Sequence, residues 1–403
     1  PLITVLAHME HVGIRIDEDK FNSLSGELAE SAAFLEEKVY KLAGEEFNLN
    51  SPKQLGEILF ERLGLPVIKR TKTGYSTSAD VLEQLKEHHE IIELILEYRQ
   101  ITKLKSTYID ALPPLINPRT GRIHTSFNQM VTSTGRLSST NPNLQNIPIR
   151  TEEGRKVREF FIPREGAVFL SADYSQVELR VLAHISQDPG LLTAFQEGED
   201  IHNQTAAEVF NVAPDEVERE HRRMAKVINF GIAYGMSPYG LARDLGVTRE
   251  EAEEYIDKYF ERFPGVKKYM DRTIAQARKE GYVTTIMGRR RYISQIKSRN
   301  YHQRSFAERA AINTPIQGSA ADIMKKAMLD VFSALNDKYP ETRILLQVHD
   351  ELVLEVPEEK FSQVAKLVRK KMERTVKLDV PLLVDLKWGY NWRDTQKMKR
   401  GEG

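Results

Sequence analysis

The chain has 403 residues, no cysteine and 58 basic against 58 acidic side chains, so any nucleic-acid-binding surface must segregate its positive charge. The lack of cysteine excludes disulfides and thiolate metal sites, and no apolar run approaches the roughly 18 residues of a membrane-spanning helix. Hydrophobic residues at 40% and charged residues at 29% are typical of a soluble globular protein with room for about two or three domains.

Two long helices are predicted in the first third of the chain. Apolar residues recur at helical spacing from 19 to 42, which indicates one amphipathic helix. Ser51 is a helix N-cap candidate, and Gln54 three residues later would close a capping box. A second long helix is predicted to begin near Ser78 and to stop before Pro113.

Between these helices, residues 69–78 form a polar, basic segment without a hydrophobic period, which predicts a loop. Lys69, Arg70 and Lys72 suit contacts with phosphates that do not depend on base sequence. The alternative is a charged loop that is merely solvated.

Two apolar segments end in carboxylates. Residues 168–172 predict a strand that delivers Asp173 and then turns helical, and residues 343–356 predict a β-hairpin with Asp350 and Glu351 at its turn. Carboxylates at buried strand ends are unfavourable unless a cation compensates them. Two hard oxygen ligands on adjacent strands suit Mg²⁺, so Asp173 and Asp350 are predicted metal ligands. The alternative for each is an ordinary cap or turn residue.

The segment 222–235 carries the strongest functional pattern. Arg222, Lys226, Phe230 and Tyr234 recur every four residues, so on a helix they form one stripe of two cations followed by two aromatic rings. Cations match phosphate oxygens and aromatic rings stack on sugar and base, so the stripe suits a nucleotide. The alternative is an amphipathic surface helix with two core aromatics.

Two other functions compete with a nucleotide enzyme. Residues 241–252 have the pattern of a helix-turn-helix, which would suit a sequence-specific DNA-binding regulator. Such a regulator needs neither the two acids nor a chain of this length. A metal-dependent nuclease built on Asp173 and Asp350 accounts for the acids but leaves the helix of cations and aromatics unexplained.

Three segments, in this order, resemble motifs A, B and C of the family A DNA polymerases. They are Asp-Tyr-Ser-Gln-Val-Glu-Leu-Arg at 173–180, the Arg, Lys, Phe-Gly and Tyr-Gly pattern at 222–235, and Val-His-Asp-Glu at 348–351. Further stretches that look like the family lie at 134–139, 143–148, 200–202 and 313–322. The resemblance is to the polymerase region of bacterial DNA polymerase I and covers nearly the whole chain.

The resemblance implies an α/β fold of the mixed α+β kind, a right-hand polymerase with an antiparallel palm sheet, helical fingers and a helical thumb. The expected regions are a palm-associated segment (1–18), the thumb (19–118), the first part of the palm with motif A (119–190), the fingers with motif B (191–310), and the second part of the palm with motif C and a C-terminal tail (311–403).

The implied function is template-directed DNA synthesis, in DNA replication and repair, by two-metal-ion transfer of a nucleotide from a dNTP to a primer 3′-hydroxyl. The expected cofactor is a pair of Mg²⁺ ions, for which Mn²⁺ can substitute, held by Asp173, Asp350 and the carbonyl of Tyr174. Glu351 adjoins this site. The expected partners are primer–template DNA and dNTPs, and the protein is expected to be a monomer in the bacterial cytosol. No proofreading exonuclease is expected, because it would need its own acidic metal cluster on a separate domain, and the chain has no room for one before the thumb.

The resemblance also assigns residues to substrates. For the dNTP, Arg222 and Lys226 would hold the β- and γ-phosphates near His202, Phe230 would lie against the deoxyribose, Tyr234 would border the templating base, Glu178 would block the 2′ position, and Gln176 would complete the site. Lys226 would also act as a general acid toward pyrophosphate. Minor-groove contacts with the primer–template end would come from Arg136, Arg309, Asn313, Gln317 and His349.

Overall fold

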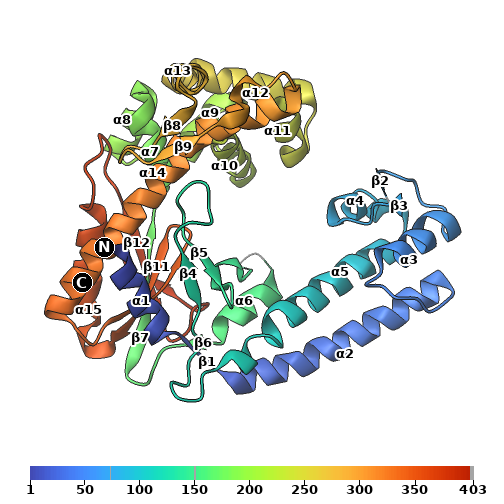
Figure 1. Cartoon of the computed structure of the whole chain (residues 1–403). Helices are drawn as coiled ribbons and strands as arrows, with labels where there is room; N and C mark the ends of the chain where they lie inside the picture. The colour runs from blue at the N-terminus through green and yellow to red at the C-terminus, as the bar shows by residue number, and fades with distance from the viewer. Residues whose placement is uncertain (73, 149–150, 400–403) are drawn as a thin grey trace.

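The computed structural model describes residues 1–72, 74–148 and 151–399. Figure 1 shows three parts: a sheet with its covering helices at the lower left, a cluster of helices above it, and an arm of two long helices that runs to the right. This arrangement confirms the predicted mixed α+β fold. Two predicted features fall partly outside the described residues, namely Thr73 of the basic loop and residues 400–403 of the C-terminal tail.

A five-stranded sheet forms the centre of the lower part. Its strands in spatial order are β10 (Arg343–Val348), β11 (Glu351–Pro357), β7 (Ala167–Tyr174), β12 (Val384–Gly389) and β13 (Gln396–Lys397), and every neighbouring pair is antiparallel. Helix α1 (Leu2–Val12) contacts β10, and α15 (Phe361–Glu373) contacts β7, β11 and β12. Because β7 is a central, covered strand, its apolar run is continuous instead of alternating.

The arm consists mainly of α2 (Glu18–Ala43) and α5 (Ile91–Leu104), which pack along each other. The first helix confirms the prediction for residues 19–42. Its base is anchored in the lower part, since the fully buried ring of Phe21 makes edge contacts with Phe160 and Phe161 at 5.2 and 6.4 Å. At the far end lie α3 (Pro52–Gly56), a π-helical turn (Glu57–Arg62), β2 (Arg70–Thr71), β3 (Gly74–Tyr75) and α4 (Ala79–Glu83).

Two predictions for the arm need correction. The second helix does start after Ser78, but it is not continuous: α4 ends at Glu83, and α5 begins only at Ile91. His89 adopts an extended backbone, and its ring nitrogen accepts a hydrogen bond from the Ile91 N–H at 3.1 Å, so it starts a new helix in the manner of a cap.

The capping box at Ser51 is only half formed. The Ser51 hydroxyl accepts from the Gln54 N–H, but the Gln54 side chain accepts from the Asn48 N–H at 2.7 Å instead of reaching back to Ser51.

The upper cluster is helical. It contains α7 (Val177–Ser186), α8 (Pro189–Glu197), α9 (Ile201–Phe210), α10 (Arg219–Ala233), α11 (Pro238–Leu245), α12 (Arg249–Arg262), α13 (Pro264–Glu280) and the first half of α14 (Tyr301–Lys338). Helix α14 runs down to the sheet (Figure 1), so the boundary expected between residues 310 and 311 falls inside one continuous helix. The boundary expected between 190 and 191 likewise falls inside α8.

The remaining elements are short. They are β1 (Arg15–Ile16) paired with β6 (Phe161–Ile162), β4 (Ser126–Asn128) paired with β5 (Ser138–Thr140), β8 (Tyr282–Thr284) paired with β9 (Arg290–Tyr292), α6 (Glu152–Glu159), a π-helical turn (Lys105–Ile109), and 3₁₀ turns at Lys86–His88, Pro113–Leu115, Leu144–Asn146, Ser294–Lys297 and Glu358–Lys360. Among the described helices, none has both the length and the apolar character needed to cross a membrane.

A buried ion pair ties the sheet to the loop before β4. Glu355 on β11 is 1% exposed and accepts two hydrogen bonds from Arg122 at 2.8 and 3.0 Å and one from the Arg164 N–H at 2.9 Å. Removing the carboxylate by Glu355→Ala would leave a mostly buried arginine without its acid and should destabilise the fold by about 3 kcal/mol, measured by urea unfolding. Exposed Glu359→Ala should change stability by less than about 0.5 kcal/mol. Equal effects of the two substitutions would contradict this role.

Candidate active site

The ends of β7 and β11 bring acidic residues together. Glu351 lies directly opposite Asp173 in the β11–β7 ladder, and Asp385 lies opposite Asp173 on the other side, in β12. The Tyr174 N–H donates to the Asp350 carbonyl at 3.0 Å, which holds the turn of the β10–β11 hairpin against the end of β7. The strand and the hairpin are thus formed as predicted, and Asp173 and Asp350 become neighbours.

The hairpin turn lacks the Asn-Gly pair that usually supplies a left-handed backbone, and His349 supplies that conformation instead. His349 takes a left-handed backbone conformation, with φ of 53°, at the first of the two turn positions. The Gln347 side chain donates to the His349 carbonyl, and the Gln145 side chain donates to the Gln347 carbonyl at 3.0 Å. These bonds from outside the turn hold it in a conformation that histidine seldom adopts.

Crowding changes the acidity of these carboxyl groups. Burial, followed by the negative charges of Glu351 and Asp350, raises the pKa of Asp173 to about 7. Burial also raises the pKa of Asp350, although the nearby Arg136 opposes this. A raised carboxyl pKa means that the ionised form lacks compensating positive charge, which a bound cation would supply.

The donor set fits Mg²⁺. Among the described residues, no three carboxylate or imidazole side chains gather into a metal cage. Mg²⁺ does not require one, because it takes one or two carboxylates and completes its shell with water and substrate phosphates. Asp173 and Asp350 could serve in this way. The Tyr174 side chain is buried and donates its hydroxyl to the Met372 carbonyl at 2.7 Å, so only the Tyr174 backbone is available to a cation.

Helix α10 presents the predicted stripe to the same acids. A cavity of about 270 Å³ is lined by Asp173, Tyr174, Gln176, Val177, Glu178, His202, Arg222, Lys226, Phe230 and Asp350. Arg222 and Lys226 are exposed, Phe230 is half-buried, and Tyr234 follows the last helical residue. The cavity therefore has carboxylates at one wall and cations with an aromatic ring at the other.

Arg222 is held by an acid that the sequence had not assigned. Both Nε and Nη2 of Arg222 lie 2.8 Å from the Asp200 carboxylate, which also caps α9 by accepting from the His202 and Asn203 N–H groups. Burial opposes ionisation of Asp200, but the hydrogen bonds from Arg222 prevail and lower its pKa. The guanidinium is thus oriented before any ligand binds.

His202 lines the cavity as a buried, neutral ring. It is 3% exposed, its Nδ1 lies 3.1 Å from the Asn229 side-chain amide, and its ring centroid lies 5.9 Å from that of Phe230. Burial, with a further contribution from the charges of Arg222 and Lys226, lowers the pKa of His202 to about 4. His202 therefore supports the aromatic side of the stripe and carries no charge at neutral pH.

Glu178 is fixed from several sides. It is 3% exposed, accepts from Arg136 at 2.6 Å and from the Tyr234 hydroxyl, and also bonds the Gln317 side chain. Arg136 lies in addition 3.8 Å from Asp350. Burial raises the pKa of Glu178 despite these partners. Its carboxylate is therefore a rigid wall of the cavity.

The residues predicted to contact DNA lie in two places. Arg309, Asn313 and Gln317 are all on α14, at the four-residue spacing that aligns them on one helix face, and His349 is exposed at the hairpin turn. Lys69, Arg70 and Lys72 are exposed at the β2–β3 tip of the arm, which Figure 1 shows well apart from β7 and α10. Of the first group, Gln317 bonds Glu178 and His349 lies next to Asp350 in the hairpin turn, and Arg136 lies 3.8 Å from Asp350. The second group is not brought to these acids.

Three residues at the site escaped sequence reasoning. Asp200 occupies a helix-start position two residues before His202, a signal that could have identified it. Asp385 lies between the buried Val384 and Leu386. This alternation predicts a strand, and an acid on such a strand is a candidate site residue. No sequence signal identifies Asn229, because an Asn in an amphipathic helix is usually solvated.

Comparison with known proteins places these features in a family. The sequence pattern described as DNA polymerase family A matches residues 18–394. DNA polymerase I of Geobacillus stearothermophilus is 55% identical over 397 residues, and that of Bacillus subtilis (strain 168) is 56% identical over 397 residues; each match covers 98% of this chain and 45% of the relative. The chain therefore spans about half the length of these curated relatives.

A solved structure is also similar. It is described as the POL domain of Pol1 from M. smegmatis in complex with DNA primer-template and dNTP. The two chains are 48% identical and superimpose with a TM-score of 0.93, over 98% of this chain and 70% of the other.

The buried His202 should make the fold sensitive to acid. Its pKa is 6.5 when unfolded and about 4 when folded, so its stabilising contribution is complete above pH 6.5 and is lost as the pH falls toward 4. This loss amounts to about 3 kcal/mol. His202→Gln should therefore lose less stability than the wild type between about pH 7 and pH 4.5 in urea titrations, whereas exposed His302→Gln should behave like the wild type. Equal acid sensitivity of all three proteins would show that His202 does not stay neutral in the folded state.

Proposed function

Because the chain belongs to DNA polymerase family A, we propose that it catalyses template-directed DNA synthesis, adding deoxynucleotides from dNTPs to a primer 3′-hydroxyl. The observation that carries the proposal is the single cavity lined by Asp173, Asp350, Arg222, Lys226 and Phe230, which unites acids for a cation with cations for a triphosphate. The similar structure from M. smegmatis is a complex with primer-template and dNTP, which supports these partners here. A role in replication and repair, as a monomer in the cytosol, completes the proposal.

The carboxylates are proposed to act with two divalent cations. Mg²⁺ ions, or Mn²⁺, held by Asp173, Asp350 and the Tyr174 carbonyl would lower the pKa of the 3′-hydroxyl and stabilise charge on the attacking and leaving oxygens. The chain's own contribution is to hold Asp173 at the end of β7 beside Asp350 in the β10–β11 turn, so that little reorganisation is needed when the substrates arrive. Glu351 is the third acid of this group.

The α10 stripe is proposed to bind the triphosphate. Arg222, oriented by Asp200, presents a planar set of donors that matches phosphate oxygens. Lys226 lies one turn further on the same face and would donate a proton to the departing pyrophosphate. Burying a triphosphate between these cations and the acids requires both signs of charge in one cavity, which this chain provides.

Sugar selection is proposed to rest on the rigid wall of the cavity. Phe230 would lie against the deoxyribose, with Gln176 beside it and Tyr234 at the templating base. The Glu178 carboxylate would occupy the space of a 2′-hydroxyl. Because its partners Arg136 and Tyr234 prevent it from turning aside, it can exclude ribonucleotides by clash.

Primer–template contacts are proposed from two surfaces. Arg136, Arg309, Asn313, Gln317 and His349 would test the geometry of the new base pair from the minor groove, where the acceptors of correct pairs are nearly equivalent. Lys69, Arg70 and Lys72 would contact phosphates at the tip of the arm, which corresponds to a thumb. In this proposal the upper helices are the fingers and the five-stranded sheet is the palm.

A sequence-specific regulator is not favoured. The predicted helix-turn-helix does form, as α11, a left-handed Gly246 and an α12 capped by Thr248. However, the exposed face of α12, which would have to enter the groove, carries Glu250, Glu251, Glu253, Glu254 and Asp257. Such a face would be repelled by the DNA backbone.

The acids at the strand ends should be needed for chemistry and not for affinity. Asp173→Ala and Asp350→Ala should abolish primer extension in Mg²⁺, while binding to primer–template DNA in fluorescence anisotropy should stay largely unchanged, because affinity comes mainly from phosphate contacts. Asp337→Ala, which removes an exposed acid near the end of α14, serves as the matched control and should extend at the wild-type rate. Extension at near wild-type rate by either site variant would exclude the proposed metal ligands.

Two residues should control two different kinds of sugar discrimination, Glu178 against ribonucleotides and Phe230 against dideoxynucleotides. Glu178→Ala should admit ribonucleotides. Because Phe230 has no hydroxyl to replace the missing 3′-hydroxyl of a dideoxynucleotide, the chain should reject these substrates. Phe230→Tyr should relax that rejection by about tenfold, the value of one added hydrogen bond of about 1.4 kcal/mol. The measurement is the ratio of single-nucleotide incorporation efficiencies for the two sugars. Exposed Glu253→Ala should leave both ratios unchanged. If Phe230→Tyr has no effect on dideoxynucleotide use, the stripe on α10 does not contact the sugar in the proposed register.

A further inference from the structure

A tryptophan in the loop between β12 and β13 contacts one of the acids of the candidate active site. Trp392 is 4% exposed, and its indole Nε1–H donates to Oε1 of Glu351 at 3.3 Å. Glu351 is the residue opposite Asp173 in the β11–β7 ladder. Like charges on opposite residues of neighbouring strands repel each other, so a free Glu351 side chain would turn away from Asp173. The hydrogen bond from the indole holds the Glu351 side chain against this repulsion.

The indole ring is itself held by its neighbours. The guanidinium of Arg158, which is 6% exposed, lies over the Trp392 ring at 4.1 Å from its centroid, and Phe161 makes an edge contact at 5.6 Å. The backbone N–H of Trp392 donates to the Phe161 carbonyl at 3.2 Å, which fixes the chain at this residue. A cation against the face of an indole draws electron density from it, which makes the N–H a better donor to a carboxylate.

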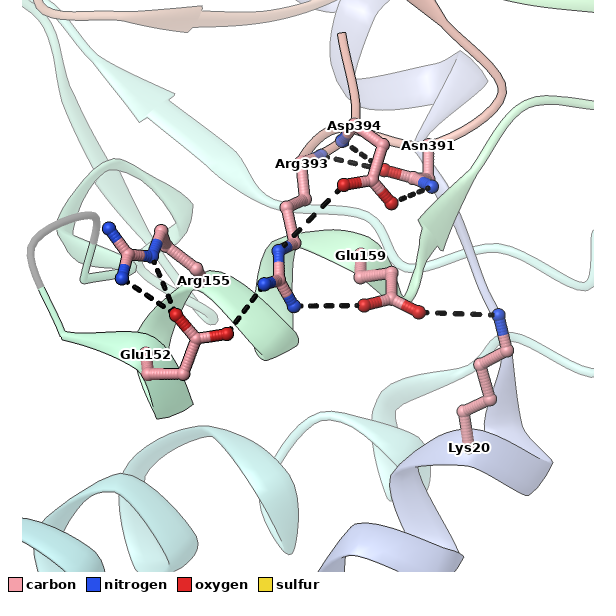
Figure 2. A network of polar contacts seen from close by, with 7 residues as sticks. All are labelled: Lys20, Glu152, Arg155, Glu159, Asn391, Arg393 and Asp394. Atoms are coloured by element: carbon pink, nitrogen blue, oxygen red, sulfur yellow. Dashed lines mark hydrogen bonds and ion pairs between the residues drawn. The ribbon is translucent and has the colours of Figure 1, made fainter.

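The residues next to Trp392 anchor it to the base of the arm. Figure 2 shows Arg393 between the carboxylates of Glu152 and Glu159 on α6, with Glu159 in turn reached by Lys20 from α2. The Arg393–Glu159 hydrogen bond is 3.1 Å long. Asn391 closes the segment as a tight turn, because its side-chain oxygen accepts from the N–H groups of Arg393 and Asp394. Trp392 is therefore fixed on both sides along the chain.

We propose that Trp392 is a positioning residue for the nucleotidyl-transfer site. It acts by holding the side chain of Glu351, the first residue of β11, beside Asp173. The Arg393 network and the Arg158 guanidinium hold the indole in turn. This inference rests on the proposed function and deepens it. Trp392 is buried and does not line the cavity, so its effect must pass through Glu351.

The test uses the only two tryptophans of the chain as a matched pair. Trp392→Phe keeps a ring for Arg158 and Phe161 but removes the N–H, and Trp388→Phe makes the same change at a ring that packs on Phe361 at 5.3 Å. Trp392→Phe should lower kcat for single-nucleotide addition by about tenfold, as expected for an outer partner of a metal site, with the KM for dNTP and the affinity for DNA unchanged. Trp388→Phe should match the wild type. Equal kcat values for the two variants would overturn the proposal.

A double-mutant cycle separates positioning from a general loss of structure. In a Glu351→Met background, Trp392→Phe should lower kcat by less than about twofold, since the residue through which it acts is already absent. A tenfold loss in both backgrounds would overturn the proposal, because the effect would then bypass Glu351.

A spectroscopic measurement tests the contact without turnover. Trp388→Phe leaves Trp392 as the sole tryptophan, so its fluorescence reports on one indole. Adding Glu351→Met should shift the emission maximum, because the indole N–H loses a charged acceptor, whereas adding Glu358→Met should not. An unchanged spectrum after Glu351→Met would overturn the contact. If the wild type and Trp388→Phe fail to extend a primer, the proposed function fails, and the fluorescence result still decides the contact.

Discussion

The constraint on which this structure depends is the repulsion between carboxylates at the ends of adjacent, buried strands. Asp173 lies between Glu351 and Asp385 in register, and Asp350 lies in the hairpin turn directly before Glu351. Burial and the neighbouring charges raise the pKa of Asp173 to about 7. A sheet would be more stable with apolar residues at these positions, so the acids are retained at the expense of stability, as is usual where charge is needed for chemistry.

The rest of the molecule compensates this charge from two directions. Arg136 lies between Glu178 and Asp350 on the open side, and Arg158 with Trp392 supports Glu351 from behind. On the opposite wall, Arg222 is paired with Asp200, outside the acid cluster. Arg222 and Lys226 therefore line the cavity where a triphosphate could bind them, and Arg222 does not neutralise Asp173. This local separation of charge resolves the difficulty that a formal net charge of zero posed for a protein proposed to bind DNA.

The sequence predicted local features well and failed where distant contacts decide. The helix at 19–42, the strand that delivers Asp173 and the hairpin around Asp350 formed as predicted. The stripe formed on α10 for Arg222, Lys226 and Phe230, with Tyr234 just past the end of the helix. The prediction of one continuous second arm helix was wrong, because the backbone is extended at His89, whose ring accepts from the Ile91 N–H where a new helix begins. The domain boundaries expected near 191 and 311 fall inside α8 and α14, since a helix can serve two regions and no local signal marks where one ends.

For the site, the sequence by itself determined which residues are proposed to carry chemistry, because acids at strand ends and a periodic stripe of cations and rings are local patterns that also match a family's motifs. Only the tertiary structure decided how these residues are held. Asp200 orients Arg222, Asn229 holds His202, and Trp392 holds Glu351 across 41 positions of sequence. Such pairs follow from packing between elements, which depends on the whole fold, and a single sequence contains no signal for the partner that a side chain will meet.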